Sequence, residues 1–173
     1  MNRRQFVIGA AVIGVSGSYV LTRPQLNLSE LTIAKAISKL DELMLASPKS
    51  TGEWSLAQIF NHSAQSVEFS MLGFPEHKPD WFKNTLGQLA FGLFSQRGEM
   101  THNLSEPIPS APKLNPDADV ESAYIRLKSA MLAFSQYEGE LAEHFAFGTL
   151  TKAEYEQAHA MHFYNHLLEI EQA

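Results

Sequence analysis

Apolar side chains recur every three or four positions along several stretches of this chain, which is the spacing that lines one face of an α-helix. No stretch shows the strict alternation of apolar and polar residues that is typical of a half-buried β-strand. The sequence therefore predicts an all-α fold. The expected helices cover residues 29–46, 55–72, 81–96, 115–137 and 151 to the C-terminal end.

Residue types at the expected helix starts support these boundaries. Ser55 with Gln58, and Thr151 with Glu154, have the spacing of a capping box, in which each side chain satisfies a free backbone amide of the first turn. Asn115 is followed by a proline and then by acidic residues, which is the composition of a helix N-terminus. Negative charge is favoured there by the helix dipole, so this acidic cluster needs no ligand.

A long connection without helical periodicity separates the third expected helix from the fourth. Residues 98–116 contain four prolines, and connections of this length are usually functional loops or loose covers. His102 lies in this connection. We expect its side chain to be exposed, with a place at the mouth of a pocket as the alternative.

Three histidines have positions that suit a metal site. His162 and His166 are four residues apart in the last helix, which puts both rings on one face, about 6 Å apart along the axis. His62 lies two turns into the second helix, on the stripe of Ile59 and Phe69. Three imidazoles from two helices can hold zinc, nickel, iron or copper and leave a position open for water or substrate. Core histidines with hydrogen-bonding partners are the alternative interpretation of the same pattern.

His159 adds another imidazole to the last helix, three residues before His162. The same face carries Tyr155 and Ile170, so we expect it to point into the core of a bundle rather than into solvent. An imidazole buried there needs a partner, because an unsatisfied buried polar group costs about 1–3 kcal/mol.

The N-terminal segment has the features of an export signal. Arg3 and Arg4 precede an apolar run over residues 7–21, as in a twin-arginine signal. This run is short for the ~20 residues of a membrane-spanning helix. We therefore predict that residues 1–22 are a twin-arginine-like signal peptide, with a signal anchor as the alternative. The protein is then periplasmic or anchored to the outer face of the inner membrane, and its folded domain covers residues 29–173.

Charge and composition exclude several kinds of partner and chemistry. The formal net charge is −6, and loss of the N-terminal segment lowers Lys+Arg from 13 to 11 against 19 Asp+Glu, which gives −8. Nucleic acid is therefore not an expected partner. The chain has no cysteine, so disulfides, thiolate ligands and a cysteine nucleophile are excluded.

These motifs resemble those of a known superfamily. The DinB-like metal-binding four-helix superfamily has a similar pattern, seen here in Trp54, Ser55, Gln58, Ile59 and His62 and in the distant His162 and His166. Within it, the chain resembles domain-of-unknown-function family 1569 from about residue 29 to the end. The residues that carry this second resemblance are Phe74, Pro75, Gly87, Ala90, Phe91, Gly98, Met100, His102, Asn103, Pro107, Ile108, Pro109, Ala111, Pro112, Gly148 and Leu150.

The resemblance implies a bundle of four helices whose second and third members are joined by a long crossover containing an extra helix, here residues 73–116. It also implies a divalent ion on His62, His162 and His166. Some relatives in the superfamily are thiol-dependent S-transferases or isomerases, in which the ion could hold and activate a small-molecule thiolate.

Two classes of function follow. As an enzyme, the protein is expected to be a metal-dependent hydrolase or thiol-dependent transferase of unknown small-molecule substrate, with His159, Glu68 or His102 as a candidate proton carrier by proximity. As a non-enzymatic protein, it would bind a structural ion, carry metal or serve as an interaction partner. Relatives often carry a histidine where this chain has Asn165, and His159 is an addition, so a closed sphere of four histidines is conceivable and would favour the second class. The other expected partners are the twin-arginine export machinery and a second copy of the chain.

Overall fold

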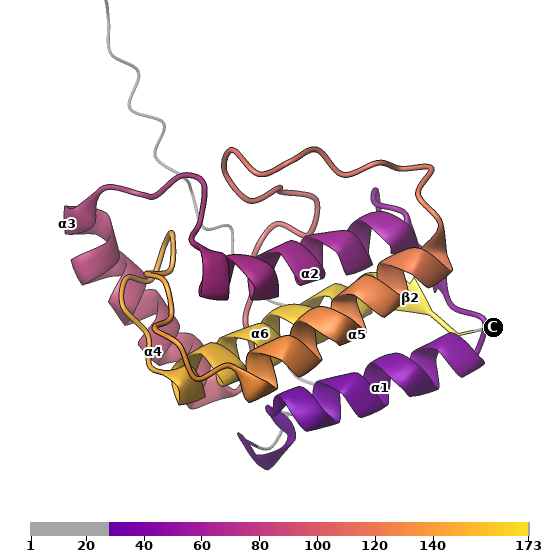
Figure 1. The fold of residues 1–173 in the computed structure, drawn as a ribbon, viewed down its shortest axis with the longest axis horizontal. Helices are drawn as coiled ribbons and strands as arrows, with labels where there is room; N and C mark the ends of the chain where they lie inside the picture. The colour runs from indigo at the N-terminus through magenta and orange to yellow at the C-terminus, as the bar shows by residue number, and fades with distance from the viewer. Residues whose placement is uncertain (1–27, 173) are drawn as a thin grey trace, which may run out of the picture.

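In the computed structural model, residues 28–172 are described, and four helices in this range pack together as a bundle. They are α1 (Ile33–Leu45), α2 (Leu56–Leu72), α5 (Val120–Gln136) and α6 (Lys152–His166). Both α1 and α2 contact α5 and α6, and Figure 1 shows the four helices running side by side. The predicted all-α fold class is confirmed.

The periodic apolar residues form a core shared by the four helices. Each helix contributes side chains that are buried almost completely, for example Leu40, Phe60, Leu127 and Phe163. Full burial of a leucine or phenylalanine side chain is worth about 1.5–3 kcal/mol, so this core supplies most of the drive for packing. The same core decides which faces of α2 and α6 turn inward, and their histidines lie on those faces.

Side-chain caps begin α2 and α6 where the sequence predicts them. Ser55 Oγ accepts from the Gln58 backbone N–H at 3.3 Å, and Gln58 Oε1 accepts from the Ser55 backbone N–H at 3.0 Å. Thr151 and Glu154 form the equivalent pair of bonds at 3.3 and 2.7 Å. Both predicted capping boxes are therefore confirmed.

The start of α5 differs from the prediction. Asp119, and not Asn115, is the N-cap, because its carboxylate accepts from the Ser122 backbone N–H at 2.7 Å. Asn115 instead caps a turn, in which its Oδ1 accepts from the Asp117 backbone N–H at 3.0 Å. Both residue types bond readily to amides two or three positions ahead, so the local sequence does not distinguish the helix cap from the turn.

The crossover between α2 and α5 carries an arm of helix at one end of the bundle (Figure 1). The arm consists of α3 (Asp80–Phe82), the π-helical segment η2 (Lys83–Gly87) and α4 (Gln88–Arg97), and it confirms the extra helix. Lys83 is buried, and its Nζ donates to Glu143 at 2.6 Å and lies 3.0 Å from Asp80. A Cβ on Gly87 would lie 2.0 Å from the Ala146 carbonyl oxygen. The arm is therefore held tightly against the loop that precedes α6.

The C-terminal end departs from the predicted helix. The helix α6 stops at His166 and is followed by a 3-10 turn, η3 (Leu167–Glu169), and by β2 (Ile170–Glu171). This strand pairs antiparallel with β1 (Lys49–Ser50), so Ile170 is extended and not helical. Strands of two residues are too short to leave a period-two signal, and their pairing depends on how the bundle brings the two segments together.

The predicted signal segment, residues 1–22, lies outside the described residues. The described part of the chain begins with a 3-10 turn, η1 (Leu28–Glu30). Between residues 28 and 172, none of the helices has the length and apolar character that a membrane crossing requires. The export and anchoring predictions therefore stay predictions.

Candidate metal centre

The three histidines predicted to bind metal lie together between α2 and α6. Nε2 of His162 is 3.1 Å from Nε2 of His62 and 3.2 Å from Nε2 of His166. His162 and His166 are one turn apart on α6, and α2 brings His62 to them because it packs against α6. Trp54, just before α2, packs on the cluster with ring centres 4.9 Å from His62 and 6.1 Å from His166.

All three rings are uncharged at neutral pH. Burial, reinforced by neighbouring histidines, lowers the pKa of His62 to about 3 and the pKa of His166 to about 2. The pKa of His162 is also well below its ordinary value, first because of burial and then because of His166 and His62. A neutral imidazole keeps a free lone pair on one nitrogen, which is the form that binds metal.

The spacing of these nitrogens suits a divalent ion. With metal–nitrogen bonds of about 2.0–2.1 Å, two ligand nitrogens lie about 2.9 Å apart at a right angle and about 3.3 Å apart at the tetrahedral angle. The observed separations of 3.1 and 3.2 Å fall between these values. Both separations from His162 therefore have the length expected for two nitrogens on one ion, and one nitrogen from each of the three residues lies within 4.8 Å of the others.

Hydrogen bonding alone leaves the cluster unsatisfied. Nδ1 of His62 and Nδ1 of His166 are buried, and no residue between 28 and 172 bonds to either atom. Nε2 of neutral His162 carries either a proton or a lone pair, so it cannot donate to one neighbour and accept from the other. Each unsatisfied buried polar atom costs about 1–3 kcal/mol. A cation that uses the three Nε2 lone pairs removes the competition at Nε2, while the two Nδ1 atoms keep no partner among these residues. The competition at Nε2 is what favours a metal site over a set of core histidines.

His102 joins the cluster from the crossover, although we expected it to be exposed. Its ring centre lies 4.9 Å from that of His162 and 5.1 Å from that of His166. One nitrogen from each of the four histidines lies within 4.8 Å of the others, so the group could hold a metal ion. Nδ1 of His102 is 2.8 Å from the side-chain amide nitrogen of Asn165. Periodicity gives no signal for such a contact, because the position of a loop residue depends on the path of the whole crossover.

The cluster includes His102 and excludes His159, which has a different partner. Nε2 of His159 is 3.1 Å from Oγ of Ser70 on α2. The Ser70 hydroxyl donates its proton to the Val67 carbonyl at 2.7 Å, so His159 is the donor in the first bond. The ring of His159 also stacks on Tyr155, with centres 5.4 Å apart. His159 is therefore a hydrogen-bonded core histidine one turn away from the cluster.

A cavity of about 240 Å³ opens beside the cluster, and His62, His102 and His162 form part of its wall. The half-buried state of His162 reflects this position. Most of the remaining wall is apolar and is formed by Phe94, Met100, Pro107, Ile108, Pro109, Phe145, Ala146, Phe147 and Ala158, with Ser66 as an uncharged polar member. Its size and lining suit a small molecule with an apolar body.

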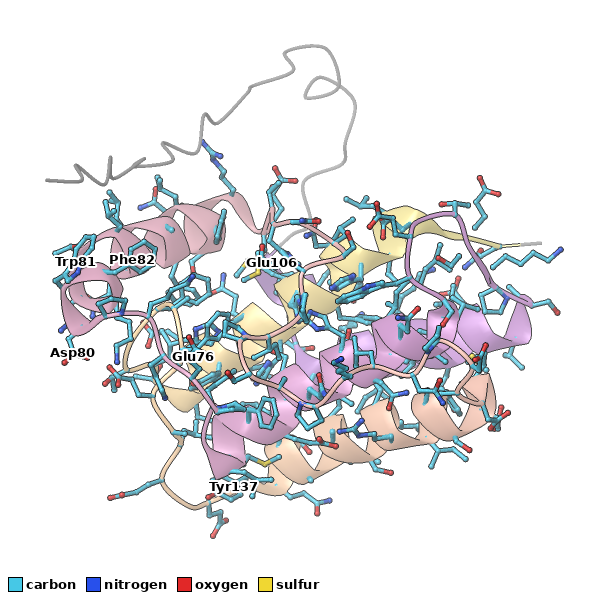
Figure 2. The ribbon with its side chains drawn as sticks, turned by 90° about the horizontal axis from the view of Figure 1, so that it is seen from above. Glu76, Asp80, Trp81, Phe82, Glu106 and Tyr137 are labelled. Atoms are coloured by element: carbon cyan, nitrogen blue, oxygen red, sulfur yellow. The ribbon has the colours of Figure 1, made fainter. Side chains whose placement is uncertain are left out.

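The two charged residues in the cavity wall are both exposed to solvent. These are Lys78 and Glu106, and no ion pair joins either of them to another described residue. Figure 2 shows Glu106 on the crossover, away from Asp80 and Trp81 at the start of the arm. The inner wall therefore offers no full charge of its own to a bound molecule.

Two uncharged histidines with defined tautomers complete the cavity wall. His144, on the loop before α6, accepts at Nδ1 from the backbone N–H groups of Ala146 and Phe147, each at 3.1 Å. Its proton is therefore on Nε2. His159 also carries its proton on Nε2, because this atom donates to Ser70. Burial lowers the pKa of both rings to about 3.

Glu68, a candidate proton carrier from the sequence, belongs to an ion pair outside the cavity wall. Its two carboxylate oxygens accept from Arg126 on α5 at 2.9 and 2.6 Å, and Arg126 also donates to Asn61 at 2.8 Å. Such a bidentate pair is geometrically specific and links α2 to α5. His102 and His159 are the proton-carrier candidates that lie near the cluster.

Comparison with known proteins supports one of the two resemblances. Residues 22–173 match the model of a family described as protein of unknown function (DUF1569). Neither the curated proteins nor the solved structures yield a match to this chain. The likeness to the wider DinB-like superfamily stays a prediction. Because the match covers nearly the whole chain, including the four clustered histidines, the protein belongs to the DUF1569 family.

Proposed function

We propose that this protein binds a divalent metal ion through His62, His162 and His166 and uses it to act on a small molecule held in the adjoining cavity. The observation that carries the proposal is the meeting of three uncharged imidazole nitrogens beside an apolar cavity, with His62 and His162 in the cavity wall. Zinc, nickel and iron all suit nitrogen ligands of this kind. A metal-dependent hydrolase or a thiol-dependent transferase of unknown substrate is the proposed reaction class.

A bound ion would lower the pKa of a water molecule or an incoming thiol and would polarise an electrophile. The protein would hold the reactants in place and keep bulk water out. Phe94, Phe145 and Phe147 in the cavity wall favour the apolar body of a substrate, and His159 is fixed in one orientation by Ser70. Nucleic acid is a poor candidate substrate because the chain is acidic.

A structural ion is the second candidate, and the presence of His102 in the cluster is the observation that favours it. Four histidine ligands would close a tetrahedral sphere and leave no position for a substrate. The cavity favours the first candidate, since three of the clustered histidines line it and an enclosed structural site needs no such opening. The number of histidines that bind the ion therefore separates the two functions.

The metal site is tested by elemental analysis of the purified protein. We expect about one divalent ion per chain after incubation with zinc, nickel or iron and removal of unbound metal. Absorption spectra of the cobalt form would report the coordination number: four nitrogen ligands alone support the structural ion, whereas additional water or added ligand supports the enzyme. Persistent absence of metal under all three conditions would contradict both candidates.

We also propose that the protein is exported by the twin-arginine route. Arg3 and Arg4 precede a short apolar run, and replacement of both by lysine is expected to leave most of the protein in the cytoplasm. Cell fractionation measures the result, and the reverse substitution, of Lys35 and Lys39 by arginine, serves as a charge-neutral control outside the N-terminal segment. Export of the double lysine variant at the normal level would contradict this route.

A further inference from the structure

We propose that His102 is not a ligand of the ion but holds an N–H group beside it, and that the site therefore selects a small anion that binds the ion and accepts a hydrogen bond from His102. The inference rests on the proposed metal site. It adds a positioning residue and a ligand class to that site.

The tautomer of His102 follows from its contact with Asn165. The side-chain nitrogen of Asn165 can only donate, and it lies 2.8 Å from Nδ1 of His102. Nδ1 must therefore accept with its lone pair. In a neutral ring the single proton is then on Nε2, and this nitrogen has no lone pair for a metal.

The Nε2–H group of His102 lacks an acceptor among the residues that the structure describes, although the atom is buried. The ring lies about 5 Å from those of His162 and His166, with centre distances of 4.9 and 5.1 Å. It also forms part of the cavity wall. A buried N–H group without an acceptor destabilises the protein, because it has lost its hydrogen bonds to water. A ligand in the cavity that accepts a hydrogen bond from His102 therefore binds more tightly than one that does not.

The required acceptor limits the class of ligand. An amine or an imidazole has one lone pair, and once this pair is on the ion nothing remains for His102. A carboxylate has two oxygens and further lone pairs, so it can bind the ion and accept from Nε2–H together. The apolar wall adds a preference for a hydrocarbon body. Butyrate has both features, and imidazole is a matched ligand without the second acceptor.

The test uses the full chain loaded with cobalt, whose visible spectrum reports added ligands. Butyrate is expected to bind, and His102→Leu should weaken it by about tenfold or more, because bonds to charged groups are worth about 1.5–3 kcal/mol. Binding of imidazole and of cobalt itself should change by less than about threefold, because neither uses the N–H group. His102→Gln, which keeps an N–H donor, should restore part of the butyrate affinity.

Asn165→Asp tests the tautomer directly. A carboxylate at this position accepts from Nδ1–H and so moves the proton away from Nε2, which then has a lone pair for the ion. We expect tighter cobalt binding, a changed visible spectrum and loss of butyrate binding. Asn103→Asp adds the same charge next to His102 at an exposed position and should leave all three measurements unchanged.

The possible results distinguish failure of the proposed role of His102 from failure of the proposed metal site. If His102→Leu weakens cobalt binding as much as His162→Ala does, His102 is a ligand and the inference is wrong, while the metal site stands. Equal butyrate affinity in the wild type and His102→Leu also overturns it. If the wild-type protein binds no metal at all, the proposed function fails first. Nitrogen-15 spectra of the histidine rings give an independent reading, because protonation of His102 at Nδ1 would contradict the proposal.

Discussion

His162→Ala is expected to lower the affinity of the protein for zinc by about 100-fold or more, since loss of a residue that merely supports a ligand already costs about 10–100-fold. His162 is the central member of the cluster, with the Nε2 atoms of His62 and His166 at 3.1 and 3.2 Å. Its removal leaves two nitrogens for the ion. Competition with a coloured zinc chelator measures the affinity, and circular dichroism shows whether the variant is folded.

Two other histidines give matched controls for this substitution. His159 is buried one turn earlier on the same helix, but its Nε2 bonds to Ser70. His159→Ala is therefore expected to reduce stability while leaving the metal content near that of the wild type. His77 is exposed, so His77→Ala should change neither property. If His159→Ala lowers zinc affinity as much as His162→Ala, His159 is a ligand and the structural ion becomes the better interpretation.

Gly87→Ala is expected to destabilise the protein by about 1–3 kcal/mol, the usual cost of forcing an extra methyl group into a packed site. The new Cβ would lie 2.0 Å from the carbonyl oxygen of Ala146, so the backbone of either the arm or the loop must move. Ala146 lines the cavity, and the displacement should also weaken the binding of cavity ligands. Urea unfolding measures the change in free energy, with butyrate binding to the cobalt form as the second measurement.

Gly92→Ala is the matched control, because Gly92 is in the same arm and nothing lies within 4 Å of the position that its Cβ would take. Alanine has a higher helix propensity than glycine by about 1 kcal/mol, so this variant should be slightly more stable than the wild type. The two substitutions make the same chemical change and should have opposite effects. Equal unfolding free energies would show that the contact between the arm and the loop is not tight.

Much of the fold could be predicted because the relevant signals are local. Ser55 with Gln58, and Thr151 with Glu154, form their bonds within one helical turn, so their spacing along the chain already specifies the helix starts. The apolar stripes act in the same way, because a helix converts a spacing of three and four residues into one buried face. The prediction failed at Asn115, where two cap-forming residues compete and the packing of the crossover decides between them.

The candidate site likewise has one part that follows from local sequence and another that depends on tertiary contacts. The sequence by itself determined that His162 and His166 share a face of one helix, because a spacing of four residues places them one turn apart. Tertiary structure decided the rest. Packing of α2 on α6 brings His62 to that pair, and the path of the crossover adds His102. His159 bonds to Ser70 and lies outside the cluster. Helix geometry depends on the nearest few residues, whereas contacts between distant segments depend on how the whole core packs. The spacing of apolar residues along the sequence shows which face of a helix is buried but not which helix packs against it.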